Sequence, residues 1–213
     1  MLLQKHSRGR FRKQDAKKML RLAQTTVGIT DPIWKYELQL LIPRLLELQV
    51  QIKGVKEKIH DFVYENFGNE VTGLLAVPGY SVISAAGVIA FVGDPKRFTG
   101  RRATNKLTAF AGLAVTQHSS GQKERLGRIS KAGPSLLRYH LGWIGMRAVK
   151  IQGPVKEFYD KMVNRGKAKS LALVAVARKI LRCSFYILRD GVAFDPNKLK
   201  RRSGLQTSVF VAS

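Results

Sequence analysis

Residues 38–62 read LQLLIPRLLELQVQIKGVKEKIHDF and carry the clearest periodicity of the chain. Apolar side chains recur there at strictly alternating spacings of three and four residues: Leu38, Leu41, Leu45, Leu48, Ile52, Val55, Ile59 and Phe62. This is the a/d seam of a coiled coil, so we predict one long helix. Two interpretations stay open, because the seam could pack on the helix's own domain or pair two chains. Pro43 predicts a kink or the start of the main helix, and Gly54 weakens it.

The next stretch, residues 71–93, contains no charged residue and is long enough to span a bilayer. Pro78-Gly79 interrupts it with a strong turn signal, so two short buried helices joined by a tight turn fit it better. With Tyr80, this turn has the form of a helix-hairpin-helix element, whose outward backbone N–H groups suit a DNA phosphate. The alternative is an ordinary helical hairpin in which the glycine only permits the turn.

In the remainder of the chain, the sequence pattern predicts further helices and a short β-hairpin. Helices are expected at residues 101–110, 134–149, 155–165 and 170–189, the last being apolar almost all round and therefore a core helix. Two β-like runs, residues 112–116 and 126–130, flank a polar tip at residues 118–122. The predicted fold class is mainly α: a long coiled-coil helix, then a compact helical domain with a helix-hairpin-helix element and a short β-hairpin.

The charge of the chain points to a polyanionic partner. The 213 residues include 38 Lys+Arg against 14 Asp+Glu, for a formal net charge of +24, and 45% are hydrophobic, too many for a disordered basic tail. Residues 96–150 contain twelve basic side chains and one acid, Glu124. Counterion release makes such a segment bind nucleic acid. The charge alone does not show whether the partner is DNA or RNA. The lone Cys183 excludes a disulfide framework and suits a reducing cytoplasm.

A serine pair, Ser119-Ser120, lies at the start of the most basic part of this segment. A serine hydroxyl attacks a phosphodiester when its proton is removed and cations offset the charge on the phosphoryl oxygens. The cations expected to hold DNA phosphates here are Lys123, Arg125, Arg128, Lys131 and Arg138. From the residues alone, however, Ser-Ser-Gly is more often an ordinary turn. His118 and His140 have no evident acid partner that would complete a triad.

Three strings together carry a resemblance to a known family. They are VPGYSVISAAGVIAFVGDPKRF, TAFAGLAVTQHSSGQKERLGRISKAGPSLLRYHL and KEFYDKMVNRGKAKSLALVAVARKILRCSFYILRDGVAFDP. In this order, between Leu74 and Pro196, they resemble the C-terminal transposase domain of the insertion-sequence "one-ten" family, also called bridge recombinases. They cover a little over half of the chain.

The resemblance implies a two-part enzyme. An N-terminal resolvase-like domain supplies acidic residues that bind Mg²⁺, and the C-terminal domain supplies a serine that attacks DNA and forms a phosphoserine link. A coiled coil joins the two parts and helps to dimerise them, and a structured bridge RNA pairs with donor and target DNA. The family's nucleophile falls on Ser120, next to Ser119. The expected partners are therefore DNA, a guide RNA and a second copy of the chain, in the cytoplasm at the nucleoid.

The N-terminal part departs from the family pattern. The acidic domain would lie before Arg8, and only Asp15 matches its last motif, with Arg12 in place of the first Asp. We therefore expect no cofactor in this chain alone and Asp15 as a remnant of the metal site. The expected division is a basic arm at 1–30, a coiled-coil helix at 33–66, the transposase domain at 70–196 and a weakly ordered tail at 197–213. The alternative function is a truncated, catalytically inactive, dimeric nucleic-acid-binding remnant.

Overall fold

The computed structural model describes residues 13–25, 31–120 and 123–196, which form a mainly α-helical chain as predicted. By their backbone contacts, the residues divide into two units, 1–53 and 54–213, and the long helix α3 runs through the boundary. Residues 1–12 and 26–30 of the predicted arm and the predicted tail, residues 197–213, lie outside the described residues.

The N-terminal unit contains α2 (Lys13–Thr25) and the first part of α3 (Pro32–Leu75). Residues 13–25, within the predicted basic arm, form α2, in which Ala16, Met19, Leu20 and Leu22 are good helix formers placed among the cations. The side chain of Asp31 begins α3 by accepting a hydrogen bond from the Ile33 backbone N–H at 2.8 Å.

The predicted long helix is confirmed as α3. Pro43 lies inside it without non-helical backbone angles, so the expected kink is not at Pro43 but at Phe67, where φ is −140° and ψ is 34°. The heptad seam is exposed in the single chain: its members from Leu38 to Phe62 are between 39% and 62% exposed, apart from the half-buried Ile59. A seam this apolar and this open is a surface that another chain could cover.

The two-helix prediction for residues 71–93 is also confirmed. The last turns of α3 and the helix α4 (Val82–Val92) are joined by the turn at residues 76–80. Ser81 caps α4 with a capping box, in which the Ser81 and Ser84 side chains each bind the other residue's backbone N–H. Among the described residues, no helix has both the length and the apolar character that crossing a membrane requires.

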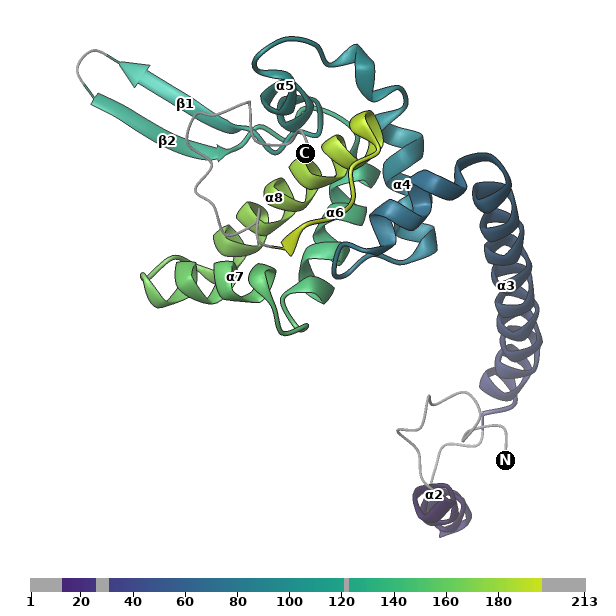
Figure 1. Cartoon of the computed structure of the whole chain (residues 1–213). Helices are drawn as coiled ribbons and strands as arrows, with labels where there is room; N and C mark the ends of the chain where they lie inside the picture. Colours follow the sequence, from purple (N-terminus) through teal and green to yellow (C-terminus); the bar gives the residue numbers. More distant parts are fainter. Residues whose placement is uncertain (1–12, 26–30, 121–122, 197–213) are drawn as a thin grey trace. The chain divides into compact units, whose positions relative to one another are not determined.

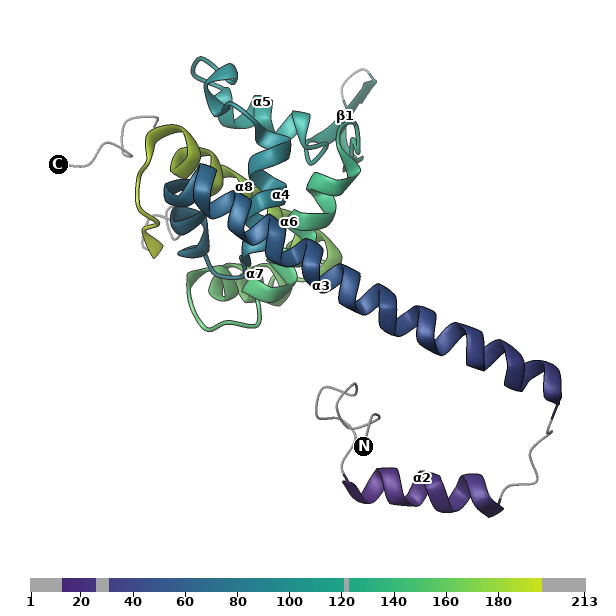
Figure 2. The same ribbon diagram turned by 90° about the vertical axis from the view of Figure 1, so that its right-hand side faces the viewer.

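The core of the C-terminal unit surrounds α8 (Lys169–Asp190), the predicted core helix. α8 packs against α5 (Ala103–Phe110), α6 (Ser135–Ala148), α7 (Pro154–Asn164) and the short 3₁₀ helix η1 (Pro95–Arg97). α4 packs against α6, and Figure 2 shows α4, α6 and α8 side by side. Fully buried side chains from α3, α5, α6 and α8, including Leu74, Leu107, Leu141 and Phe185, fill the space between these helices.

The predicted hairpin is present, and its strands are longer than expected. β1 (Val115–Ser120) pairs antiparallel with β2 (Lys123–Ile129), and the ribbon projects from the helices in Figure 1. The sequence pattern places residues 118–122 in a polar tip, but residues 118–120 belong to β1. Backbone pairing sets the length of a two-stranded ribbon, and polar side chains do not prevent that pairing.

Gly79 allows the α3–α4 turn to pack directly on α6. Its φ is +94°, and a Cβ added there would overlap the Ile144 carbonyl oxygen and lie 2.8 Å from the Ala148 nitrogen. We expect Gly79→Ala to lower the free energy of unfolding by about 2–4 kcal/mol, because it combines a backbone clash with an unfavourable φ.

Urea denaturation measures this effect, and Gly54→Ala is the matched control. Gly54 lies in α3, and a Cβ added there would have no atom within 4 Å. The control substitution should stabilise the helix by up to about 1 kcal/mol. Equal effects of the two substitutions would contradict the close approach at Gly79.

Candidate nucleic-acid interface

The β-hairpin that carries the candidate serine is anchored at its base by backbone hydrogen bonds. The Ser130 N–H donates to the Ala114 carbonyl at 2.8 Å, and the Lys131 N–H donates to the Gly112 carbonyl at 3.0 Å. The Leu113 N–H donates to the Thr108 carbonyl in α5, again at 3.0 Å. The ribbon therefore starts from the buried core at Leu113 rather than from a free loop.

Ser120 is the last residue of β1, and its backbone is in register with Lys123, the first residue of β2. Ser119 is in register with Glu124, and His118 with Arg125. The side chains of residues 117–128 lie outside the described part of the chain. The structure thus brings the backbone of the candidate nucleophile next to the start of the predicted basic strand.

Arg138 braces the base of the hairpin. From the first turns of α6, its Nη1 donates to the Gly133 carbonyl at 2.8 Å and to the Ala111 carbonyl at 3.4 Å. These carbonyls belong to the two chain segments that lead into β1 and out of β2. The guanidinium therefore joins the two segments, a role that the sequence does not indicate and that stands beside the predicted phosphate contact of Arg138.

Other cations of the basic segment are also engaged within the domain. Arg97 lies over the rings of Phe98 and Phe110, with its carbon Cζ 4.7 and 4.5 Å from the ring centroids, and donates to the Phe91 carbonyl. Arg147 donates to the Trp143 carbonyl and to Ser84 Oγ, each at 3.3 Å. These arginines hold elements together through carbonyls, hydroxyls and aromatic rings.

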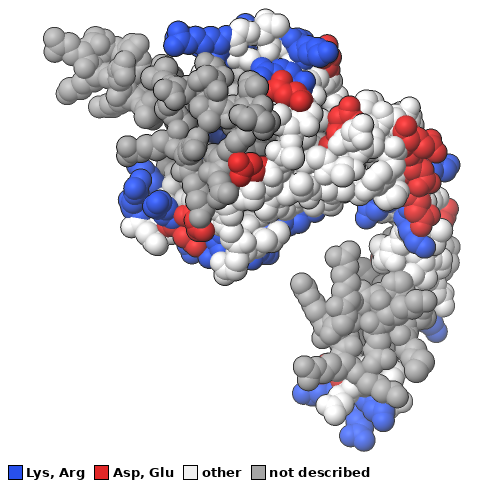
Figure 3. Space-filling view, viewed as in Figure 1, with Lys and Arg blue, Asp and Glu red and all other residues white. Residues whose placement is uncertain are grey.

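A second group of cations faces solvent. Arg101, Arg102 and Lys106 are exposed at the start of α5, and Lys131 is exposed at the foot of β2. On the face drawn in Figure 3, Lys and Arg side chains gather over α5 and the loop that precedes it and again over α7. These exposed cations are available to a polyanion.

The predicted phosphate clamp at Pro78, Gly79 and Tyr80 makes contacts inside the domain. Gly79 is buried against α6, and Pro78 is half-buried. The Tyr80 hydroxyl lies 2.6 Å from Ser184 Oγ, and Ser184 donates to the Ile180 carbonyl, so Tyr80 is the donor to Ser184. Burial raises the pKa of the Tyr80 phenol above its ordinary value. These contacts connect the turn to α6 and α8.

The titratable groups of the described core do not form a nucleophile–base pair. Burial raises the pKa of the Cys183 thiol to about 11, so the thiol stays protonated at neutral pH. Desolvation, with a smaller effect of the Arg147 charge, lowers the pKa of His140, whose ring packs over Gly87. In the part of the chain that is described, no three His, Cys, Asp or Glu side chains lie close enough to hold a metal ion. Asp15 lies in the first turn of α2, in the other unit.

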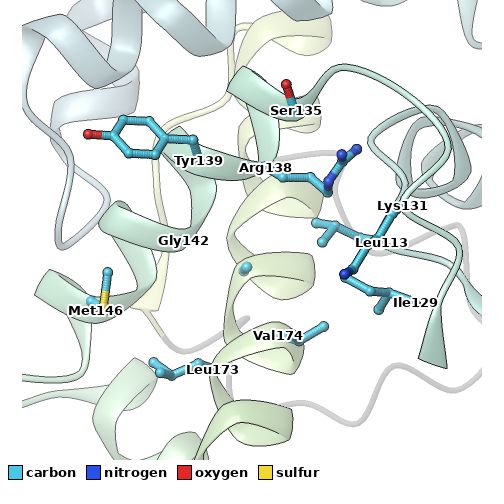
Figure 4. A pocket seen from close by; sticks show the side chains of 11 residues that line it. Leu113, Ile129, Lys131, Ser135, Arg138, Tyr139, Gly142, Met146, Leu173 and Val174 are labelled. Atoms are coloured by element: carbon cyan, nitrogen blue, oxygen red, sulfur yellow. The ribbon is translucent and has the colours of Figure 1, made fainter.

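An apolar hollow of about 370 Å³ lies beside the hairpin base, between α6 and α8. Its lining is mostly apolar and includes Leu113, Ile129, Met146, Leu173 and Val174. Figure 4 shows Lys131 and Arg138 on the side of the hollow nearest the hairpin, with Ser135 and Tyr139 on α6. No pattern in the sequence indicates this hollow, because its lining comes from segments far apart in the chain.

These features define a basic, mainly α-helical domain that carries a serine-bearing β-hairpin. Residues 72–160 match the family described as "Transposase IS116/IS110/IS902 family". The chain therefore contains a transposase domain of this family, as the sequence strings indicated.

Several named proteins resemble the chain over this domain. The transposase for insertion sequence element IS1111A of Coxiella burnetii is 34% identical over 161 residues, which are 74% of this chain and 43% of that protein. A probable family 20 transposase of Pseudomonas aeruginosa is 39% identical over 105 residues, 49% of this chain and 27% of that protein. A pilin gene-inverting protein of Moraxella lacunata is 27% identical over 124 residues, 57% of this chain and 38% of that protein. The chain thus spans less than half the length of these relatives.

The brace formed by Arg138 gives a testable consequence. Arg138→Gln should lower the free energy of unfolding by about 1–3 kcal/mol, because two carbonyls lose a charged donor. In hydrogen exchange, the amides of Leu113 and Lys131 should exchange faster, since both close the hairpin base. Lys150→Gln removes an exposed charge after α6 and should change neither measurement. Unchanged exchange in Arg138→Gln would show that the hairpin base does not need the brace.

Proposed function

We propose that this chain takes part in DNA strand transfer as a serine-nucleophile transposase or site-specific recombinase. The observation that carries the proposal is the position of Ser120 at the end of β1, paired with the first residue of the basic strand β2, within the family-matched segment. The base of this ribbon is anchored in the core at Leu113, and the ribbon carries Ser120 at its other end. The names of the relatives, two transposases and a pilin gene-inverting protein, agree with DNA rearrangement as the reaction class.

In this mechanism, the Ser120 Oγ attacks the phosphorus of a DNA phosphodiester. The new bond joins serine oxygen to phosphorus, one DNA ester bond breaks, and the serine proton ends on the released DNA hydroxyl. A hydroxyl of the second DNA strand then attacks the phosphoserine and restores the serine. Each step conserves the number of phosphodiester-type bonds. The cations Lys123, Arg125, Arg128 and Lys131 would offset the charge that develops on the phosphoryl oxygens.

The family resemblance adds partners to this proposal. DNA and a structured guide RNA would share the exposed cations of the C-terminal unit, in the cytoplasm at the nucleoid. Mg²⁺ would be bound by acidic residues of the resolvase-like part, to which Asp15 corresponds. The described residues hold no cluster of three ligand side chains, and the steps above use only groups of this chain and of the DNA.

The covalent intermediate offers a direct test. With a DNA substrate, the wild-type chain should form a protein–DNA adduct that survives denaturing electrophoresis. Ser120→Ala should reduce the adduct by about a hundredfold or more, because the attacking oxygen is removed. Ser119→Ala is the matched control and should retain the adduct. An adduct that persists in Ser120→Ala and disappears in Ser119→Ala would move the nucleophile to Ser119.

A second candidate function is a dimeric nucleic-acid-binding protein without strand-transfer activity. The exposed cations Arg101, Arg102 and Lys106 favour it, because they can bind phosphates without any covalent step. Salt-sensitive DNA binding without any adduct, even when a full-length family member is added, would select this function over the enzyme.

We also propose that the heptad seam of α3 pairs two copies of the chain. Leu48 belongs to the seam, and Val50 is an exposed apolar residue of the same helix that lies outside it. Leu48→Glu should weaken dimerisation by about tenfold or more, because it buries a carboxylate in the paired seam. Val50→Glu should leave dimerisation unchanged. Sedimentation equilibrium measures both, and equal weakening by the two substitutions would contradict pairing through this seam.

A further inference from the structure

The outer side of α6 carries apolar and aromatic side chains that the domain does not bury. Leu136, Tyr139, Trp143 and Met146 are 57%, 58%, 48% and 37% exposed, and we call these four residues the α6 aromatic face. The opposite side of the helix, with Leu137, Leu141 and Ile144, is fully buried in the core. The core therefore fixes the position of α6 and leaves the aromatic face open.

The two rings of this face are arranged as a platform. The Tyr139 and Trp143 ring centroids lie 6.1 Å apart with an interplanar angle of 70°, an edge-to-face contact that holds the rings in position. Tyr139 also contacts the His140 ring edge-to-face at 5.7 Å. Arg147 bonds to the backbone carbonyl of Trp143 and to Ser84, which ties the helix behind the rings to α4.

The hollow beside the hairpin base continues from this platform. Tyr139 and Met146 belong both to the α6 aromatic face and to the lining of the hollow. The volume of about 370 Å³ is in the range of sites for small organic groups. Among the residues with described side chains, Lys131 and Arg138 are the charged members of the lining, and none is acidic. An occupant should therefore combine a flat apolar group with a negative charge.

We propose that the α6 aromatic face and the adjoining hollow bind an unpaired nucleobase of a single-stranded nucleic acid. The base stacks on the ring of Tyr139, which lines the hollow and contacts Trp143, and its phosphate lies near Lys131. Stacking of a base on an aromatic side chain tolerates any base sequence, because every base has a flat π face. The inference rests on the proposed function, since strand exchange separates base pairs and supplies unpaired bases.

Charge favours this occupant over a protein helix. A protein segment that covered an apolar stripe between Lys131 and Arg138 would need acidic side chains at matching positions. Within this unit, Asp160 and Asp190 are already paired with Lys156 and Arg189. A nucleotide supplies the ring and the charge in one group.

Intrinsic fluorescence gives a direct readout of the site. The chain contains two tryptophans, Trp34 and Trp143, so Trp34→Phe leaves Trp143 as the single reporter. The probes are oligothymidylate and oligouridylate of about 12 nucleotides, within the site sizes of single-strand-binding folds, and an abasic strand of equal length. The abasic strand keeps the phosphates and removes the bases. We expect both base-containing strands to quench Trp143 and to bind about 5- to 100-fold more tightly than the abasic strand.

Variants separate stacking from charge. Tyr139→Ala and Trp143→Ala should weaken oligothymidylate binding about 5-fold or more, measured by fluorescence anisotropy of a labelled strand, and should leave abasic binding within about twofold. Trp143→Phe should restore most of the affinity, because a flat ring remains. Tyr36→Ala is the matched control: Tyr36 is 63% exposed on α3, and its loss should change neither affinity. Circular dichroism confirms that each variant is folded, and all of these positions are exposed, so the fold should tolerate the changes.

The outcomes distinguish this inference from the proposed function. Equal affinity for base-containing and abasic strands would overturn the nucleobase site and leave DNA binding intact. Failure to bind any of the strands would overturn both. Base-dependent binding without a covalent adduct would support the nucleobase site and contradict catalysis by this chain. If soluble quenchers do not reduce the Trp143 fluorescence of the free protein, a protein segment covers the α6 aromatic face. That result would overturn the proposal. A preference between the thymidylate and uridylate strands assigns the site to DNA or to RNA.

Discussion

A shortage of carboxylates in its basic segment determines how the C-terminal unit uses its arginines. Its basic segment, residues 96–150, has twelve cations and one acid, so ion pairs cannot organise it. Arg97, Arg138 and Arg147 instead donate to backbone carbonyls and a serine hydroxyl, and Arg97 also lies over an aromatic ring. A guanidinium has five donors in a fixed plane, so one arginine can join two chain segments. The same segment leaves Arg101, Arg102, Lys106 and Lys131 exposed to solvent, where they can bind phosphate.

Periodicity made most of the fold predictable from the sequence. The 3–4 spacing from Leu38 to Phe62 predicted α3, and the turn at Pro78-Gly79 predicted the break before α4. Both signals are local, since each depends on residues within one or two turns of chain. The helix α2 was not predicted, because charge alone identified these residues as part of a basic arm. The strand ends were misplaced because polar residues at 118–120 look like a turn. Helix propensity and backbone pairing outweigh the polar composition in these two places.

The candidate site was predictable only in part, since it depends on tertiary contacts. The sequence indicated a serine on a hairpin, and the pairing of Ser120 with Lys123 agrees with that placement at the level of the backbone. It could not show that Arg138 reaches Ala111, which is 27 residues away in the chain, or that Gly79 lies against Ile144. The sequence shows that a residue is a cation, but the tertiary packing decides which group it binds. For this reason the sequence indicates a phosphate ligand at Arg138 but not the hydrogen bonds by which Arg138 braces the hairpin base.

The Arg138 brace, the base of the hairpin and the α6 aromatic face are all connected through helix α6. Arg138 and Tyr139 are neighbours on α6, so the residue that holds the hairpin base is adjacent to the ring that we propose as a stacking platform. The buried side of α6, with Leu137 and Leu141, fixes both of them relative to the core. A nucleic acid bound on this face would press against the helix that supports the hairpin carrying Ser120. The bound base and the hairpin that carries Ser120 would then both be held by α6. A rotation of α6 about its axis would move both of them together.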